Sequence, residues 1–409
     1  MNRVVVTGIG GVCALGSDWE AIERGLRAGR NAVRRMAEWE RYTEMGTRLA
    51  APIPDFAVPA HWTRKQVRSM GRVSQLAVRS SELALADAGL LGDPLLQAGG
   101  FGVACGSSVG STADISDFAQ MLLTGASAGL NANTYVRMMP HTTAANIGIF
   151  FGLTGRIIPT SSACTSGSQA IVYACEAIRH GYQQAMLAGG AEELCPSQAM
   201  AFDLLYATCR RNDDAAQVPQ PYDRDRDGLV VGEGGGMLVL ESLESAQARG
   251  ARILAEIVGV ASNSDGTHVT RPRQETMQRV MELALADAGL GAAAIGYVNG
   301  HGTSTEHGDI AETQATSAVF GARMPISSQK SYLGHTMGAC GALEAWVTIM
   351  GLARGWYPPT INLNNIDPRC GELDYIRGDG RRIDADHAMS NNFAFGGVNT
   401  SIVFRRWQS

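Results

Sequence analysis

The sequence lacks several features that would place it in familiar classes of protein. Aromatic residues make up only 6% of the 409 residues and the net charge is −5, so no basic, aromatic-lined surface for nucleic acid is expected. No stretch reaches the roughly 20 apolar residues that a membrane span requires. The N-terminus, residues 1–8, has no long apolar region of the kind found in signal peptides. We therefore expect a soluble, cytoplasmic protein that binds no nucleic acid and has no membrane span.

The cysteines lack any pairing pattern. Eight are present, and no two form a C-x-x-C pair; they stand at positions 13, 105, 164, 175, 195, 209, 340 and 370. Neither a structural zinc site nor a disulfide framework is expected from such spacing. A reducing compartment is the simplest setting, and the sequence predicts no metal site.

Apolar residues and glycine, in contrast, are abundant. Hydrophobic residues make up 45% of the chain, enough for one large core or two fused ones. The segment ELALADAGL at 82–90 recurs identically at 282–290, and an apolar strand follows each copy, at 102–106 and at 295–300. This agreement predicts an internal duplication. The halves would be residues 1–250 and residues 251–409.

Each half alternates predicted strands and helices, which indicates an α/β protein with mostly parallel sheets covered by helices.

The glycine-rich stretch at 8–11 is expected to be a tight strand-to-helix connection. It is not a dinucleotide loop, because Cys13 breaks the G-x-G-x-x-G spacing. The charged segment 219–228 is expected to be a structural loop, because Arg224 and Arg226 would repel a calcium ion.

Cys164 occupies a position suited to a nucleophile. An apolar segment ends in small hydroxyl residues, then comes Cys164, and then a segment with helical periodicity, so a strand, a tight turn and a helix are predicted. Unpaired backbone N–H groups and the positive end of the helix dipole favour a thiolate at a helix N-terminus. A free cysteine is also often a small buried hydrophobe, and this turn alone leaves both interpretations open.

Two histidines lie in similar settings. His301 follows an apolar segment on a turn rich in glycine and hydroxyl residues, Lys330 and His335 precede a helix, and an aromatic and glycine-rich turn follows at 391–397. Ligand sites in α/β sheets lie at the carboxyl ends of strands. Together with Cys164, these turns favour a catalytic site over structural roles for the histidines.

As a set, these motifs resemble those of the elongating β-ketoacyl-acyl-carrier-protein synthases, condensing enzymes of the thiolase superfamily. The resemblance covers essentially the whole chain and rests on residues 163–167, 301–305, 330–335 and 392–397. It implies a thiolase-like, five-layered αβαβα fold with internal duplication. It also implies a homodimer, or a heterodimer with a paralogous ketosynthase-like subunit. No cofactor is implied, because the substrates arrive on the phosphopantetheine of an acyl carrier protein.

The resemblance also implies a reaction in two halves. The Cys164 thiolate would take an acyl chain from the carrier thioester. Malonyl-acyl-carrier protein would then lose CO₂, and the resulting carbanion would attack the acyl-enzyme, extending a fatty-acid or polyene chain by two carbons. Neutral His301 and His335, donating from Nε2, would hold the enolate charge.

Further roles follow by resemblance. The backbone N–H groups of Cys164 and Phe395 would form an oxyanion hole, with Phe395 also the gate of the acyl pocket. Lys330 and Glu344 would orient His335 and tune the site electrostatically. The remaining positions are the pantetheine-binding residues Thr303 and Thr305, the acyl-pocket residue Val109, and a basic patch for the carrier protein, Arg64, Lys65, Arg68 and Arg211.

Two other functions share features with this interpretation. A degradative thiolase would pair one histidine with a second catalytic cysteine, and Cys340 and Cys370 lie outside any matching motif. A non-catalytic chain-length factor would lack the nucleophile.

The pair Glu306-His307 and Gln329 depart from common fatty-acid enzymes, and the chain is also similar to ketosynthases of aryl-polyene synthesis.

Overall fold

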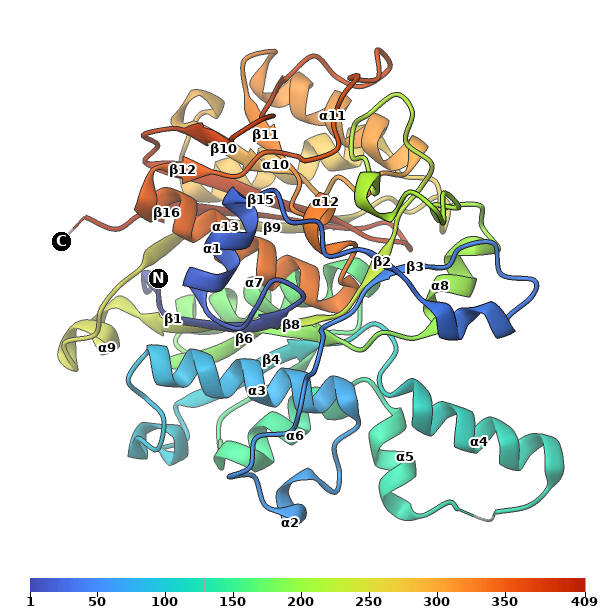
Figure 1. The fold of residues 1–409 in the computed structure, drawn as a ribbon. Helices are drawn as coiled ribbons and strands as arrows, with labels where there is room; N and C mark the ends of the chain where they lie inside the picture. The colour runs from blue at the N-terminus through green and yellow to red at the C-terminus, as the bar shows by residue number, and fades with distance from the viewer. Residues whose placement is uncertain (128, 409) are drawn as a thin grey trace.

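The protein is built in five layers, αβαβα. The computed structural model describes residues 1–127 and 129–408, and Figure 1 shows two sheets with helices between them and on their outer faces. The first sheet contains β1 (Val4–Cys13), β4 (Phe101–Gly106), β5 (Ile157–Pro159), β6 (Ala185–Glu192) and β8 (Gly234–Ser242). The second contains β9 (Ala255–Ser264), β10 (Ile295–Asn299), β11 (Pro325–Ser327), β15 (His387–Phe393) and β16 (Val398–Arg406).

The two sheets repeat one topology. Their strand orders are β5-β4-β6-β8-β1 and β11-β10-β15-β16-β9, so each strand of the first sheet has its counterpart at the same place in the second. The second sheet has one further strand at its edge, β13 (Asp374–Tyr375), which pairs with β11. The internal duplication is therefore confirmed. Parallel pairing is limited to the outer strands, since β8 runs antiparallel to both β6 and β1, as β16 does to β15 and β9. The expectation of mostly parallel sheets is wrong for these inner strands. A short antiparallel pairing between β1 and β9 joins the two sheets.

The helices form three layers around these sheets. On the outer faces lie α3 (Arg72–Asp87) and α6 (Thr142–Phe151) in the first half, and α10 (Gln274–Ala288) and α11 (Glu306–Phe320) in the second. Between the sheets lie α7 (Ser166–Arg179) and α13 (Cys340–Arg354). Every residue of α13 from Cys340 to Ile349 is buried, as expected for a helix that is covered on all sides.

The glycines at 8–11 belong to a strand, so the predicted strand-to-helix connection is wrong. A Cβ at Gly8 would lie 2.4 Å from the carbonyl oxygen of Ala84, and one at Gly259 would lie 2.2 Å from that of Ala284. The glycines let α3 and α10 lie close against their sheets. The duplicated segments ELALADAGL supply the helix side of both contacts.

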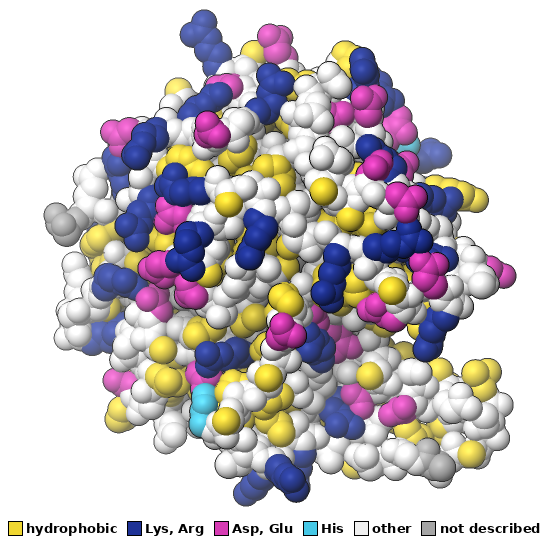
Figure 2. All heavy atoms as spheres, viewed as in Figure 1, with side chains coloured by type: hydrophobic (Ala, Val, Ile, Leu, Met, Phe, Trp, Pro, Cys, Tyr) yellow, Lys and Arg dark blue, Asp and Glu magenta, His cyan; other side chains and the backbone are white. Residues whose placement is uncertain are grey.

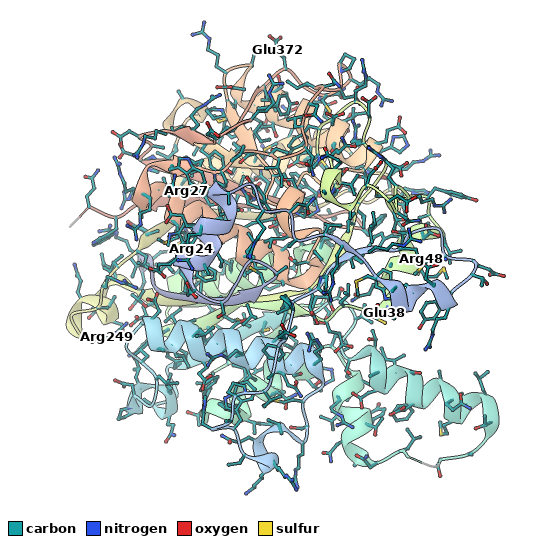
Figure 3. All side chains as sticks on the ribbon, viewed as in Figure 1. Arg24, Arg27, Glu38, Arg48, Arg249 and Glu372 are labelled. Carbon is teal, nitrogen blue, oxygen red and sulfur yellow. The ribbon has the colours of Figure 1, made fainter. Side chains whose placement is uncertain are left out.

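The remaining elements lie at the periphery. Helices α4 (Thr112–Thr124) and α5 (Ala132–Met138) project from the body at the lower right of Figure 1. Figure 2 shows basic and acidic side chains interleaved over the visible face, and in Figure 3 labelled charged residues such as Arg24 and Glu38 lie at the surface. Among the described residues, no helix has the length and apolar character needed to cross a lipid bilayer. Short elements complete the fold: α1 (Trp19–Arg27), β2 (Arg34–Arg35), β3 (Leu49–Ala51), α2 (Arg64–Val67), α8 (Pro196–Asp203), β7 (Val231–Gly232), α9 (Leu243–Ala248), α12 (Lys330–Leu333), β12 (Trp356–Tyr357), β13 (Asp374–Tyr375) and β14 (Arg381–Arg382).

Candidate active site

Cys164 lies on a tight turn between β5 and the central helix α7. The turn is a short 3-10 helix, Ala163–Thr165, and Ala163 has the left-handed φ of 51°, an unusual conformation for a residue with a side chain. The Cys164 side chain is buried, with 3% of its surface exposed. The strand, turn and helix predicted around Cys164 are confirmed.

The second half contains an equivalent turn. A 3-10 helix, Met337–Ala339, leads into the central helix α13, and Met337 has a φ of 46°. By position, Met337 corresponds to Ala163 and Gly338 corresponds to Cys164. His335 lies just before this turn, and the two turns contact each other. The duplication therefore brings Cys164 and His335 together at the centre of the molecule.

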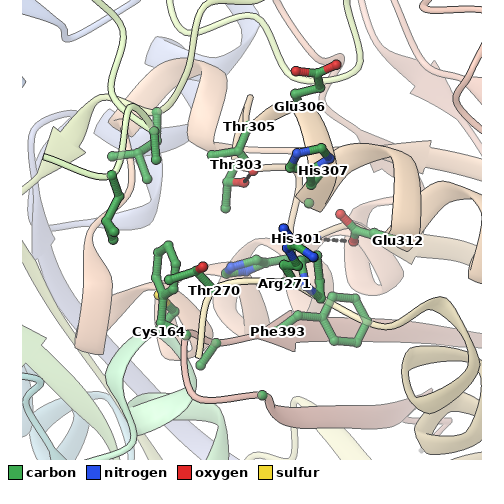
Figure 4. Close-up of a pocket in the computed structure, with 18 of the residues that line it drawn as sticks. Cys164, Thr270, Arg271, His301, Thr303, Thr305, Glu306, His307, Glu312 and Phe393 are labelled. Carbon is green, nitrogen blue, oxygen red and sulfur yellow. Dashed lines mark hydrogen bonds between the residues drawn. The ribbon is translucent and has the colours of Figure 1, made fainter. Parts of the chain in front are cut away.

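His301 completes a group of three at the end of β10. The Cys164 sulfur and a ring nitrogen from each of His301 and His335 lie within 4.8 Å of one another. The two imidazole rings are 5.2 Å apart between centroids and stand at 86°. The group lies in a cavity of about 590 Å³ that opens toward the protein surface, whose walls include Thr303, Thr305 and Phe395 (Figure 4). The sequence correctly predicts that these three residues meet.

Hydrogen bonds fix the tautomer of both histidines. Nδ1 of His301 accepts from Nζ of Lys330 at 3.1 Å and from the amide of Asn392 at 3.3 Å. Nδ1 of His335 accepts from the backbone N–H of Met337 at 3.2 Å. These partners can only donate, so each neutral imidazole carries its proton on Nε2. Nε2 of His335 has no hydrogen-bond partner in the described part of the chain, which leaves its N–H free for a ligand.

Both imidazoles are held neutral. Burial, reinforced by the positive charge of Lys330, lowers the pKa of His301 and of His335 well below the usual value. Lys330 remains an ammonium because it pairs with Glu344, which also accepts from Asn392 at 2.7 Å. The prediction that Lys330 and Glu344 orient His335 is wrong. Lys330 contacts His301, and Glu344 contacts Lys330. His335 is instead oriented by the backbone N–H of Met337.

The Cys164 sulfur is a thiol at rest. Burial raises its pKa to about 11, and the charge of Lys330 and the backbone N–H of Phe395 oppose this rise only in part. The lowered pKa expected from the helix N-terminus is therefore outweighed by the loss of water around the sulfur. The N–H groups of Cys164 and Phe395 both lie against the sulfur, where the resemblance implies an oxyanion hole.

Cys164, His301 and His335 have the spacing of a three-ligand metal site, but their protonation does not suit a metal. A histidine ligand binds through an unprotonated nitrogen, with the other ring nitrogen donating a hydrogen bond. Here Nδ1 accepts in both histidines and Nε2 carries the proton. The arrangement favours hydrogen-bond donation to a substrate oxygen.

A buried arginine holds the turn at the cavity wall. The side chain of Arg226, 1% exposed, donates to the carbonyl oxygens of Thr305 at 3.2 Å and Glu306 at 2.9 Å. It pairs with Asp367 at 2.7 Å and Asp309 at 3.6 Å. The loop 219–228 is structural, as predicted. Its contact with the Thr303–Thr305 turn had no signal in the sequence, because the two segments are far apart in the chain.

Glu312 is a second residue that the sequence did not reveal. It lies on α11, lines the cavity, and accepts the backbone N–H groups of His301 and Gly302. Burial raises its pKa to about 8. A glutamate within a helix has no motif that would connect it with the histidine turn before it.

The other predicted residues occupy separate places. The Thr303 and Thr305 hydroxyls are hydrogen-bonded to each other at 2.8 Å in the cavity wall, whereas Val109 is half-buried and outside the described cavity lining. The basic residues of α2 and its C-terminal end, Arg64, Lys65 and Arg68, are exposed. Arg211 is half-buried, paired with Asp214 at 3.1 Å and hydrogen-bonded to Gln220 at 2.6 Å.

Known proteins share both the sequence and this fold. The family described as "Beta-ketoacyl synthase, N-terminal domain" matches residues 1–246, and "Beta-ketoacyl synthase, C-terminal domain" matches residues 254–364. A relative from Synechocystis sp. (strain ATCC 27184 / PCC 6803 / Kazusa), named 3-oxoacyl-[acyl-carrier-protein] synthase 2, is 36% identical over 100% of this chain and 99% of its own length.

Two solved structures extend the comparison. A β-ketoacyl synthase from Burkholderia phymatum STM815 has a TM-score of 0.99 and 62% identity, with 100% of both chains covered. A type II PKS ketosynthase solved in complex with its acyl-carrier protein, AntDE:AntF, has a TM-score of 0.87 and 29% identity, covering 99% of this chain and 100% of that one. The chain belongs to the β-ketoacyl synthase family and has the thiolase-like ketosynthase fold. It is a ketosynthase, an acyltransferase that extends acyl chains by condensation.

Proposed function

We propose that the protein lengthens a carrier-bound acyl chain by two carbons, through decarboxylative Claisen condensation with malonyl-acyl-carrier protein. One observation carries this proposal. A buried thiol faces two neutral imidazoles whose Nε2–H groups are fixed as donors by Lys330 and by the backbone of Met337. A nucleophile with two preorganised donors for a developing negative charge suits thioester chemistry that passes through an enolate.

In the first step, Cys164 attacks the thioester carbonyl of an acyl-carrier protein. The backbone N–H groups of Cys164 and Phe395 hold the charge on the carbonyl oxygen, and the pantetheine thiolate leaves. The proton lost by Cys164 ends on the departing pantetheine sulfur, so the exchange of one thioester for another is balanced. Thr303 and Thr305 line the path of the arm, and Phe395 is the gate toward the acyl pocket, to which Val109 contributes.

In the second step, the malonyl thioester oxygen accepts hydrogen bonds from Nε2 of His301 and His335. Loss of CO₂ leaves an enolate whose charge these donors stabilise, and its carbon attacks the acyl group on Cys164. Collapse of the tetrahedral intermediate gives the extended β-ketoacyl chain and releases Cys164 as a thiolate, which takes a proton from water to return to the resting thiol. No metal or redox cofactor takes part, because the phosphopantetheine of the carrier protein brings both substrates.

Two rival functions fit this site less well. A chain-length factor has no use for a nucleophile, and Cys164 is present with both histidines. A degradative thiolase needs a second reactive cysteine across the cavity. Here Cys340 lies behind the nucleophile, where its thiol donates to the carbonyl oxygen of Cys164 at 3.2 Å, and burial raises the pKa of Cys340 well above its usual value.

We assign the halves as residues 1–250, with the nucleophile, and 251–409, with the histidines. The partners are an acyl carrier protein and a second subunit, either another copy or a paralogous chain. An unpaired edge strand supports the second subunit, because β5 ends the first sheet and its Ile157 is 45% exposed.

The cytoplasm is the expected location. The pathway is fatty-acid elongation or, given Glu306-His307 and Gln329, aryl-polyene synthesis.

The test uses a radiolabelled acyl-carrier protein. We expect the wild type to keep the label after denaturation and the Cys164→Ala variant to keep none. The His335→Ala variant should still accept label but lose malonyl decarboxylation, measured as release of CO₂. Equal labelling of wild type and Cys164→Ala, or no label on either, would instead favour a scaffold subunit.

A further inference from the structure

Glu192 is a fully buried carboxylate that the reaction described above does not use. It is the last residue of β6 and is 0% exposed. Burial raises the pKa of this carboxyl, and hydrogen bonds from Ser108, Ser107 and Gly338 oppose the rise. A carboxylate inside a protein needs several donors to replace its lost hydration. The groups that donate to Glu192 are therefore held closely against it.

The segment that follows β4 fixes the carboxylate from one side. The Ser107 hydroxyl donates to Oε1 of Glu192 at 2.9 Å, and the backbone N–H of Ser108 donates to Oε2 at 2.7 Å. The Ser108 hydroxyl donates to Oε2 as well. Ser107 is itself held, because its hydroxyl oxygen accepts the backbone N–H of Gly110 at 3.0 Å. Both carboxylate oxygens thus have a set place.

On the other side, Glu192 holds the turn that orients His335. Oε2 accepts the backbone N–H of Gly338 at 3.1 Å, and the preceding N–H, that of Met337, donates to Nδ1 of His335 at 3.2 Å. Met337 has a left-handed φ of 46°, a conformation that persists only where the surrounding structure holds it. The carbonyl oxygen of Gly338 is also tightly enclosed, since a Cβ at Gly190 would lie 2.2 Å from it. Successive N–H groups of one turn therefore bind Glu192 and His335.

We propose that Glu192 is a positioning residue for malonyl decarboxylation, which acts on His335 through the Met337–Gly338 backbone. This rests on the proposed function. Glu192 lies outside the described cavity lining and so touches no substrate atom. Its bond to Gly338 fixes the turn, and the turn fixes Nδ1 of His335. Nε2 of His335 then keeps its direction toward the malonyl thioester oxygen.

Two conservative variants separate the position of this carboxylate from its charge. Glu192→Asp keeps the charge, but its side chain is one methylene shorter and cannot reach all its donors. Glu192→Gln loses the charge and keeps an amide oxygen that can accept the N–H groups of Ser108 and Gly338. The charge itself has a separate readout at Cys164. Burial is the main cause of the raised pKa of Cys164, and the negative charge of Glu192 adds to it.

The experiment measures CO₂ release from malonyl-acyl-carrier protein, acyl labelling of Cys164, and alkylation of Cys164 by iodoacetamide in the alkaline range. In Glu192→Asp we expect CO₂ release to fall by about tenfold or more, while labelling falls less and alkylation keeps its wild-type rate. In Glu192→Gln we expect CO₂ release near the wild-type value and faster alkylation. A role in stability alone would not produce this crossed pattern.

Glu241→Asp is the matched control. Glu241 is also a glutamate with 0% exposure, on β8, but it is hydrogen-bonded to Thr7 and Arg249 and lies outside the described cavity lining. This variant should lower the unfolding temperature without changing the ratio of CO₂ release to labelling.

Three results would overturn the proposal. Wild-type CO₂ release in Glu192→Asp would show that the bond to Gly338 does not orient His335. Equal losses of CO₂ release in Glu192→Asp and Glu241→Asp would reduce the effect to stability. A loss in Glu192→Gln as large as in Glu192→Asp would assign the effect to the charge and not to the hydrogen bond. Failure of the proposed function has a different signature, because the wild type itself would then release no CO₂.

Discussion

Nζ of Lys330 lies 3.1 Å from Nδ1 of His301 and also pairs with Glu344, with all three side chains buried. A cation that can only donate thus faces one nitrogen of the imidazole and forces the proton to the other. Lys330 acts on the reaction through His301, which makes it a positioning residue in our scheme.

Removing this cation should destabilise the protein and slow decarboxylation. Lys330→Met leaves the Glu344 carboxylate buried without its ion pair, which typically costs about 3–5 kcal/mol. Thermal unfolding should show the loss. The double variant Lys330→Met/Glu344→Gln should recover most of the stability but not the decarboxylation rate, because Nδ1 of His301 has lost its charged donor and keeps only the neutral amide of Asn392. A single variant as stable as the wild type would contradict the buried ion pair.

The resting thiol should become reactive only at high pH. Because the pKa of Cys164 is raised to about 11, the thiolate fraction grows throughout the alkaline range. Alkylation of Cys164 by iodoacetamide, followed by peptide mass spectrometry, should therefore keep accelerating above about pH 9, whereas an ordinary cysteine with a pKa near 8.5 levels off. A plateau below that pH would mean that the helix N-terminus dominates over burial.

Malonyl decarboxylation should be insensitive to mild acid. The pKa of each histidine is lowered well below 6.5, so both stay neutral and donate from Nε2 until the pH falls beneath that lowered value. We expect no inflection near pH 6.5 when CO₂ release by Cys164→Ala is followed against pH. An acidic limb there that disappears in His335→Gln would show that this imidazole titrates normally.

Arg226 should affect substrate binding more than chemistry. Arg226→Lys keeps the charge but cannot hold both carbonyl oxygens of the Thr305–Glu306 turn, so KM for the carrier substrate should rise while kcat changes less. Arg226→Met should also lower the unfolding temperature, since Asp309 and Asp367 lose a buried partner. Arg224→Met, at an exposed position of the same loop, is the control and should leave both constants unchanged.

Charge reversal on α2 tests the basic patch. Replacing Arg64, Lys65 and Arg68 by glutamate should slow association of the carrier protein at low salt, and the difference should shrink at high salt. Stopped-flow binding measures this directly. Arg24→Glu, on the exposed face of α1, is the control. Unchanged association at low salt would remove these three residues from the docking surface.

The sequence predicts the fold correctly where a local pattern coincides with the structure of one short segment. The nine-residue repeat predicts the duplication because Ala84 and Ala284 make the same close contact with a glycine strand. The turn at Cys164 is predictable because the periodicity changes from strand to helix within a few residues. Both signals are contained in short segments of the chain.

The predictions that failed depend on contacts between distant segments. Glycines at 8–11 suit a turn as well as a strand beneath a helix, and only α3, much later in the chain, decides between them. Lys330 is close to His335 in sequence, but the fold places it against His301. The Cys164 pKa follows from the burial of the sulfur, which a local helix terminus does not reveal.

The turn Met337–Ala339, which is equivalent to the Cys164 turn, shows why the duplicated protein is chemically asymmetric. Gly338 stands where Cys164 stands in the other half, and a Cβ there would lie 3.0 Å from Oε2 of Glu192 and 3.1 Å from Cα of Ser107. Glu192 also accepts the Gly338 N–H at 3.1 Å. A side chain at this position would crowd Glu192 and Ser107, and the glycine there leaves each chain a single attachment point, which carries one growing intermediate at a time.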